Sequence, residues 1–85
     1  MPVKTFSVSP KASKNANKFP SKIHRKIDRA FEILKQNPLT GEKLRGKLAD
    51  YYKYRIGDYR IVYRFDAKKS TLLVVKIEHR QGVYR

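Results

Sequence analysis

Apolar residues recur every three to four positions between Ser21 and Asn37, a spacing typical of an amphipathic helix. They form one stripe along the expected helix, which consists of Ile23, Ile27, Ala30, Phe31 and Leu34. Ser21 is placed to cap the start of this helix, and Asn37 with Pro38 ends it. A second, weaker helix is expected over KASKNANK, residues 11–18. The link between the two helices is short, which predicts an antiparallel helical hairpin.

Other parts of the chain alternate with a period of two, which is typical of β-strands. A short first strand is expected at 3–8, and a linker with two glycines occupies 41–50. The clearest alternation lies in YYKYRIGDYRIVYRF, residues 51–65, and a last strand is expected at 71–79. The predicted fold class is therefore α+β: a small antiparallel β-sheet packed against an N-terminal helical hairpin, in the order β-α-α-β-β-β.

The segment 51–65 separates two kinds of side chain. Gly57 and Asp58 suit a two-residue hairpin loop of type II′, which places Arg55 across from Arg60. One face then carries Tyr52, Tyr54, Ile56, Tyr59, Ile61, Tyr63 and Phe65 and should pack on the helices. The other face carries Lys53, Arg55, Arg60, Val62 and Arg64. Like charges directly opposite one another destabilise a sheet, so this basic face is expected to meet an anion.

The register of the last strand depends on the loop at 67–70. An effectively odd loop would turn the apolar residues toward the helices, namely Leu73, Val75 and Ile77. It would also bring Lys76, Glu78 and Arg80 to the basic face. An even loop would bury Lys76 and Glu78 instead, so the odd register is preferred. The same parity points His79 toward the core side unless the strand ends before it.

Charge narrows the class of partner. The chain has 21 Lys and Arg against 7 Asp and Glu, a formal net charge of +14, which favours a polyanion, then an acidic protein, then an anionic membrane surface. It has no cysteine and no apolar run long enough for a membrane span or signal peptide. We therefore expect a single domain over 1–85, soluble and cytoplasmic, without membrane contact.

The sequence offers little for other kinds of catalysis. No Gly-rich phosphate loop is present, and the carboxylates are too few and too scattered for a two-metal site. Serine and histidine form no recognisable nucleophile pair. No metal or cofactor is expected, and a cation-driven cleavage of a phosphoester is what remains among enzymes. His24 lies among Lys22, Arg25 and Lys26 on the long helix and is expected to be solvated.

The segments KLRGKL, YYKYRIGDYRIVYRF and HRQGVYR together resemble the RelE/ParE toxin superfamily, and in particular its RelE-like messenger-RNA endoribonucleases. The resemblance covers essentially the whole chain. It implies a toxin of a type II toxin-antitoxin system that cleaves messenger RNA in the ribosomal A site and so inhibits translation. It also implies a cognate antitoxin as partner. The implied reaction is metal-free attack of a ribose 2′-hydroxyl on the adjacent phosphorus, which leaves a 2′,3′-cyclic phosphate and a 5′-hydroxyl.

The resemblance also implies which residues do the chemistry: Lys53, Arg55, Arg60, Arg80 and Tyr84. All but Tyr84 lie on the face that strand parity already identified as basic. A second lysine is common in the family where this chain has Arg55, and a guanidinium keeps its proton, so Arg55 stabilises charge but does not act as base. Lys53 is the leading candidate base, and His79 is its rival for base or acid. Tyr84 is suited to stack on a nucleobase.

RNA contacts are expected around this set from Arg64, Lys76, Arg45 and Lys47. Two other functions remain open on the same residues. The superfamily includes ParE-like inhibitors of DNA gyrase on the same scaffold, and a non-catalytic RNA- or ribosome-binding domain would show the same basic face. The Lys53, Arg55 and Arg60 group and the tail from Arg80 to Tyr84 favour the endoribonuclease over the gyrase inhibitor.

Overall fold

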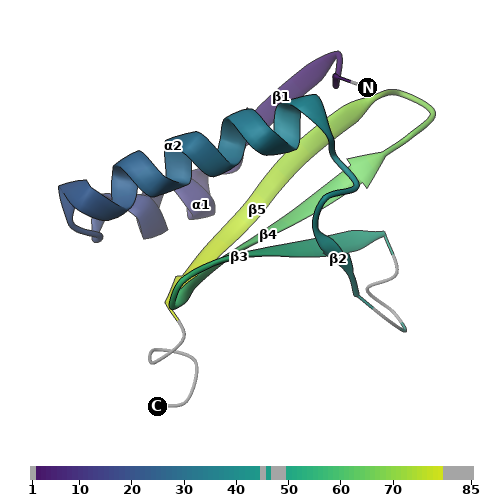
Figure 1. The fold of residues 1–85 in the computed structure, drawn as a ribbon. Coiled ribbons are helices and arrows are strands. Elements are labelled where there is room, and N and C mark those ends of the chain that lie inside the picture. The colour runs from purple at the N-terminus through teal and green to yellow at the C-terminus, as the bar shows by residue number, and fades with distance from the viewer. Residues whose placement is uncertain (1, 45, 47–49, 80–85) are drawn as a thin grey trace.

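The computed structural model describes residues 2–44, 46 and 50–79. In this part of the chain, two helices lie on one face of a five-stranded sheet with the strand order β1-β5-β4-β3-β2 (Figure 1). The elements are β1 (Thr5–Val8), α1 (Pro10–Asn17), α2 (Ser21–Gln36), β2 (Glu42–Lys43), β3 (Tyr51–Ile56), β4 (Tyr59–Asp66) and β5 (Thr71–His79). The predicted α+β fold is confirmed. The sheet is mixed, because β1 runs parallel to β5, and the short strand β2 was not predicted.

The two helices begin in different ways. Ser9 caps α1 by accepting a hydrogen bond from the Ala12 amide (3.1 Å), and Pro10 takes the first helical position. Pro20, not Ser21, precedes α2, and no side chain caps that helix, so the predicted Ser21 cap is wrong. The extended conformation of Pro20 already starts the helix, because its carbonyl accepts from the amides of the first turn. No helix in the described ranges is long and apolar enough to span a membrane.

The β3–β4 hairpin has the predicted register. Arg55 pairs with Arg60 and Lys53 pairs with Val62 across a two-residue loop. Gly57 has a positive φ of 60° and Asp58 does not, as a type II′ turn requires. The aromatic and aliphatic face therefore points to the helices, and the cations point to the opposite side of the sheet.

The first half of the last strand differs from the predicted register because the loop before it is even, and a β-bulge then restores the predicted parity. The loop at 67–70 has four residues, and Asp66 pairs with Thr71, so Leu72 and Val74 face the core rather than the predicted Leu73 and Val75. The register then shifts: Tyr63 pairs with Val74 but Val62 pairs with Lys76, which leaves Val75 as the extra residue. Beyond the bulge, Ile77 faces the core, and Lys76 and Glu78 lie on the basic side, as predicted.

Where β1 ends, the side chains of Ser9 and Asn15 take its place as hydrogen-bond partners of the β5 backbone. Ser9 Oγ donates a hydrogen bond to the Val75 carbonyl (2.8 Å), and the Ile77 amide donates to Asn15 Oδ1 (3.0 Å). Backbone groups at the bulge are therefore satisfied by side chains instead of a strand. These contacts hold the second half of β5 in place, and that half carries part of the basic face.

Tyr63 ties the segment after α2 to the middle of the sheet. Its ring is fully buried, stacks on Tyr52 at 5.3 Å between centroids, and its hydroxyl donates to the Pro38 carbonyl (2.6 Å). The same hydroxyl accepts from the Gly41 amide (3.0 Å). Burial raises the pKa of Tyr63 to about 12, since the charged phenolate would lose its hydration; the Gly41 amide acts in the opposite direction.

Replacing Tyr63 by phenylalanine should lower the free energy of unfolding by about 1–3 kcal/mol, because two buried backbone groups lose their partner. The raised pKa means that folding favours the neutral phenol. This contribution is therefore complete below pH 10 and is lost as pH rises from 10 toward 12. Urea unfolding across this range should show a loss of stability that the variant lacks. Tyr54→Phe, which removes a hydroxyl with no hydrogen bond among the described residues, is the control; an equal effect there would contradict the assignment.

Candidate functional site

The sheet face opposite the helices, called the outer face here, carries five cations in cross-strand rows. One row runs Glu42, Lys53, Val62, Lys76 across four strands, and the next runs Arg55, Arg60, Glu78. A third row holds Tyr51, Arg64 and Leu73. Directly paired residues have Cβ atoms about 5 Å apart. The rows therefore bring Lys53, Arg55, Arg60, Arg64 and Lys76 together on a surface that no helix in the described residues covers.

Val62 sits among these cations and is nevertheless only 6% exposed. It is paired with Lys53 on one side and Lys76 on the other. Long aliphatic stems of lysine and arginine cover apolar neighbours while their charged ends reach solvent. Val62 is therefore a covered apolar residue at the centre of the outer face, with cations paired to it on both sides.

Glu78 is paired with two of the cations. Its Oε2 lies 3.2 Å from Arg60 Nη2, and its Oε1 lies 3.1 Å from Lys76 Nζ. Partial burial raises the pKa of Glu78, but the hydrogen bonds and charges of Lys76 and Arg60 outweigh that effect and hold it below its ordinary value of 4.5. Glu78 is therefore a carboxylate over the working pH range, and the outer face contains a fixed negative charge among its cations.

Tyr51 is the aromatic residue of the outer face. The Arg64 guanidinium lies over its ring at 6.0 Å from the centroid, a cation–π contact. Tyr51 is paired with Arg64 and, by strand parity, shares the face of Lys53 and Arg55. A flat ring beside an arginine is a surface on which an unstacked base can lie.

His79 lies on the helix side of the sheet, away from Lys53 and Arg60. It pairs with Tyr59, and the two rings meet edge to face at 4.6 Å between centroids. Tyr59 in turn contacts Phe19 at 4.7 Å, so His79 ends an aromatic row that packs against the helices. The position agrees with the predicted parity, and it separates the His79 imidazole from the cations by the thickness of the sheet.

Four of the predicted site residues lie outside the described part of the chain: Arg45, Lys47, Arg80 and Tyr84. The structure brings together Lys53, Arg55, Arg60, Arg64 and Lys76 on the outer face. It places His79 on the other face. Sequence reasoning predicted Glu78 on the basic side but missed its ion pairs, and it missed Glu42, because the pairing of β2 with β3 cannot be read from two residues.

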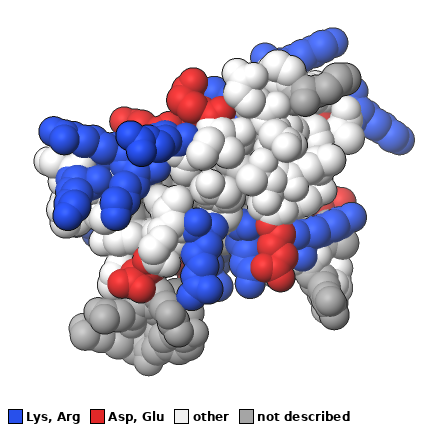
Figure 2. All heavy atoms as spheres, viewed as in Figure 1, with Lys and Arg blue, Asp and Glu red and all other residues white. Residues whose placement is uncertain are grey.

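A second group of cations covers the helices. Exposed cations are Lys11 and Lys14 on α1, Lys18 directly after it, and Lys22, Arg25, Lys26 and Arg29 on α2. In each helix the spacing of three or four residues places them along one side. Figure 2 shows Lys and Arg gathered over the end of α2 that begins at Ser21. Positive charge therefore occupies both layers of the molecule, not the outer face alone.

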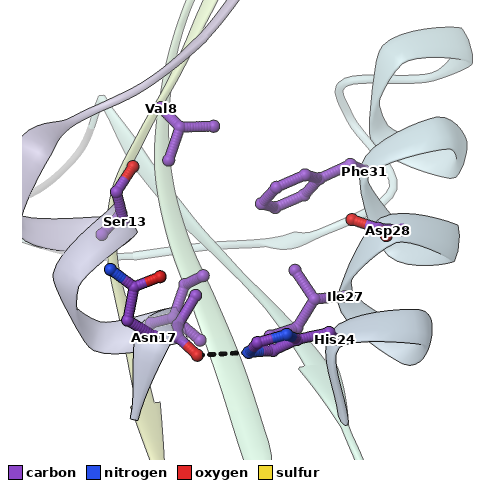
Figure 3. Close-up of a pocket in the computed structure, with 10 residues that line it drawn as sticks. Val8, Ser13, Asn17, His24, Ile27, Asp28 and Phe31 are labelled. Atoms are coloured by element: carbon purple, nitrogen blue, oxygen red, sulfur yellow. Dashed lines mark hydrogen bonds between the residues drawn. The ribbon is translucent and has the colours of Figure 1, made fainter. Parts of the chain in front are cut away.

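A hollow of about 300 Å³ opens between α1 and α2 (Figure 3). Its apolar lining includes Ile27, Phe31 and Ile77, and Asp28 lies at its edge. His24 reaches across it and hydrogen-bonds the Ala16 carbonyl at the end of α1, so the expectation that His24 is solvated is wrong. The physical reason is that the turn at Lys18–Pro20 brings the start of α2 beside the end of α1. Among the residues that the structure describes, no lysine or arginine lines this hollow.

The outer face can stabilise a phosphate that gains negative charge. Guanidinium and ammonium donors lie in adjacent rows, and two of them, the Lys53 and Lys76 amines, can exchange a proton. Within residues 2–44, 46 and 50–79, no three His, Asp or Glu side chains come together as metal ligands. The cations of the outer face can stabilise negative charge, and their lysine amines can take part in proton transfer.

Residues 6–84 match the family described as ParE toxin of type II toxin-antitoxin system, parDE. Toxin RelG of Mycobacterium tuberculosis is 34% identical over 76 residues, which cover 87% of each chain.

Solved toxin structures share the fold of this chain. The chain superimposes on a chain of the toxin-antitoxin complex RelBE2 from Mycobacterium tuberculosis with a TM-score of 0.82 and 32% identity, covering 94% of this chain and 93% of that one. The isolated RelE toxin of E. coli gives a TM-score of 0.78 at 25% identity, with 94% and 89% covered. The shared fold extends over nearly the full length of both relatives.

Proposed function

This chain belongs to the ParE toxin family of type II toxin-antitoxin systems, within the RelE/ParE superfamily, and on that premise we propose that it is a ribosome-dependent endoribonuclease of messenger RNA. The observation that carries the proposal is the outer face. Lys53, Arg55 and Arg60 lie in adjacent cross-strand rows beside the buried Val62. Tyr51 offers an aromatic ring on which a nucleobase can stack.

In the proposed reaction the Lys53 amine removes the proton of a ribose 2′-hydroxyl. The 2′-oxygen then attacks the adjacent phosphorus, and the bond from phosphorus to the 5′-oxygen breaks. Arg55 and Arg60 neutralise the charge that develops on the phosphoryl oxygens. The products are a 2′,3′-cyclic phosphate and a 5′-hydroxyl, whose oxygen takes up a proton. Among the described residues, the position of Lys53 on the outer face favours it over His79 as base.

The distribution of charge supports a ribosomal setting. A protein that binds one RNA strand needs a single basic groove, whereas this chain exposes cations on the sheet and along both helices (Figure 2). A protein bound in a site enclosed by folded RNA can have its sheet and its helices in contact with RNA at the same time. We therefore propose that the outer face meets the message and that the helical cations contact the surrounding RNA.

We also propose a cognate antitoxin as partner. The Mycobacterium tuberculosis relative was solved in a toxin-antitoxin complex. An acidic or amphipathic segment suits a chain of formal net charge +14, because it would neutralise the cations that bind RNA.

Inhibition of DNA gyrase is the second candidate, since the matching family is described by its ParE toxin. Induction of the chain in a bacterial host separates the two functions. We expect new messenger-RNA 5′ ends within translated regions, each carrying a 5′-hydroxyl, within minutes of induction. Purified protein should cut message bound to ribosomes much faster than the same free RNA. Gyrase-linked DNA breaks without new RNA ends would contradict the proposal and favour the second candidate.

A further inference from the structure

Glu78 is an unusual residue for a surface that binds RNA. It lies on the outer face in the same row as Arg55 and Arg60, where a negative charge weakens the attraction for phosphate. Its side chain is 19% exposed, against 40% for Arg60 and 41% for Lys76. The Glu78 side chain is therefore more buried than the side chains of the two cations that it binds.

The two oxygens of Glu78 bind cations from two different strands. Oε2 accepts a hydrogen bond from Arg60 Nη2 on β4 (3.2 Å), and Oε1 lies 3.1 Å from Lys76 Nζ on β5 itself. On its other side Arg60 is paired with Arg55, a like charge that pushes it away. Attraction from one neighbour and repulsion from the other favour the same placement of the Arg60 guanidinium.

The contact leaves donors available for a ligand. Glu78 uses one nitrogen of the Arg60 guanidinium, Nη2, and Nε is buried without a hydrogen-bond partner in the described part of the chain, so the donors left for a ligand are those of the terminal nitrogens. Proton transfer is not the role that this geometry suits, because both oxygens of Glu78 face cations and its pKa is held low. What the carboxylate can do is fix where the donors of Arg60 and Lys76 point.

On the premise of the message-cleaving function above, we propose that Glu78 is a positioning residue: its carboxylate holds the Arg60 guanidinium and the Lys76 ammonium in place for the phosphate that is cleaved, and in doing so it lowers the affinity for RNA. Glu78 thus raises the rate of cleavage and weakens the binding of RNA. Preorganised donors act on the charge of the transition state, whereas removal of a negative charge strengthens binding of any phosphate.

Glu78→Gln should therefore separate binding from rate. The Kd for ribosomes that carry a message with a 2′-deoxy residue at the cleavage position should fall by roughly two- to fivefold at low salt, since one negative charge is removed. The cleavage rate at saturation should fall by roughly 10- to 100-fold, because Arg60 is no longer held. Glu78→Asp keeps the charge on a shorter side chain, so its Kd should stay close to that of the unmodified protein and its rate should exceed that of Glu78→Gln.

Glu42→Gln is the matched control. Glu42 lies on the same face, paired with Lys53, and no ion pair joins it within the described residues. Its removal subtracts the same charge, so the Kd should fall similarly, but because Glu42 holds neither Arg60 nor Lys76 the rate at saturation should not show the loss expected for Glu78→Gln. An equal loss of rate in Glu42→Gln, or an unchanged rate in Glu78→Gln, would overturn the positioning role.

A readout without cleavage keeps this test separate from the proposed function. In the isolated protein, the ¹⁵N relaxation of the Arg60 Nε–H group should report an ordered side chain that becomes mobile in Glu78→Gln but not in Glu42→Gln. If the protein does not cleave message, the proposed function fails, and the relaxation data still decide whether Glu78 holds Arg60. Equal Arg60 mobility with and without the Glu78 carboxylate would overturn the inference.

Discussion

Replacing Arg60 by alanine should lower the rate of message cleavage at saturating ribosome concentration by about 10²- to 10³-fold, the typical cost of removing one transition-state donor. The fold should be retained, because Arg60 lies on the outer face while its neighbour Ile61 points to the core. Glu78 keeps Lys76 as a partner, so the variant does not leave a carboxylate without a cation. Single-turnover cleavage and thermal unfolding, measured on the same preparation, check both parts of this expectation.

Arg64→Ala is the matched control for that result. Arg64 belongs to the same strand and the same face, but it lies over Tyr51 instead of beside Glu78. Its loss should weaken ribosome binding and reduce the slope of log Kd against log salt by about one, with little change in the rate at saturation. If both variants lose the same fraction of the rate, Arg60 acts through general charge rather than as a donor to the reacting phosphate.

Gly41→Ala should lower the free energy of unfolding by roughly 2–4 kcal/mol, a large share of the stability of a small domain. A Cβ at this position would lie 2.5 Å from the Tyr63 hydroxyl and 2.8 Å from the Lys53 carbonyl oxygen. The loop must move, and the hydrogen bond from the Gly41 amide to Tyr63 is lost with it. Because the Lys53 backbone is one of the contacts, cleavage at saturation should fall as well. Urea unfolding and single-turnover cleavage measure the two effects.

Gly57→Ala separates this close approach from ordinary strain at a glycine. Gly57 has a φ of 60° and nothing within 4 Å of an added Cβ, so its cost should come from the backbone conformation alone, about 1–2 kcal/mol. The cleavage rate should not change. A Gly41→Ala variant as mild as Gly57→Ala would mean that the segment after α2 shifts without disturbing β3.

The β3–β4 hairpin could be predicted from sequence because one short loop determines every pair in it. Once Gly57 and Asp58 form the turn, strict alternation assigns Arg55 and Arg60 to one face and Ile61 to the other. The amphipathic helix was predictable for a similar reason, since its apolar stripe repeats along the helix from Ile23 to Leu34. Local rules were sufficient in both cases, and they placed the cations of the site correctly.

The last strand could not be placed by the same rules. A strand with regular alternation cannot turn Leu72, Val74 and Ile77 to one face, and the sequence carries no mark of the extra residue at Val75. The predicted odd register reproduced only the part of β5 after the bulge. The Tyr63 contacts with Pro38 and Gly41 were also beyond sequence reasoning, because they join positions more than 20 residues apart. The ion pairs of Glu78 depend on that same register.

The extra residue at Val75 determines which substitutions β5 can accept together. Before it, even-numbered residues pack in the core; after it, odd-numbered residues do. Lys76 and Glu78 lie on the outer face, so they can change during evolution without altering the packing of the core residues Leu72, Val74 and Ile77. A strand built in this way can acquire a new target by substitutions at its outer-face positions, while its core positions preserve the fold.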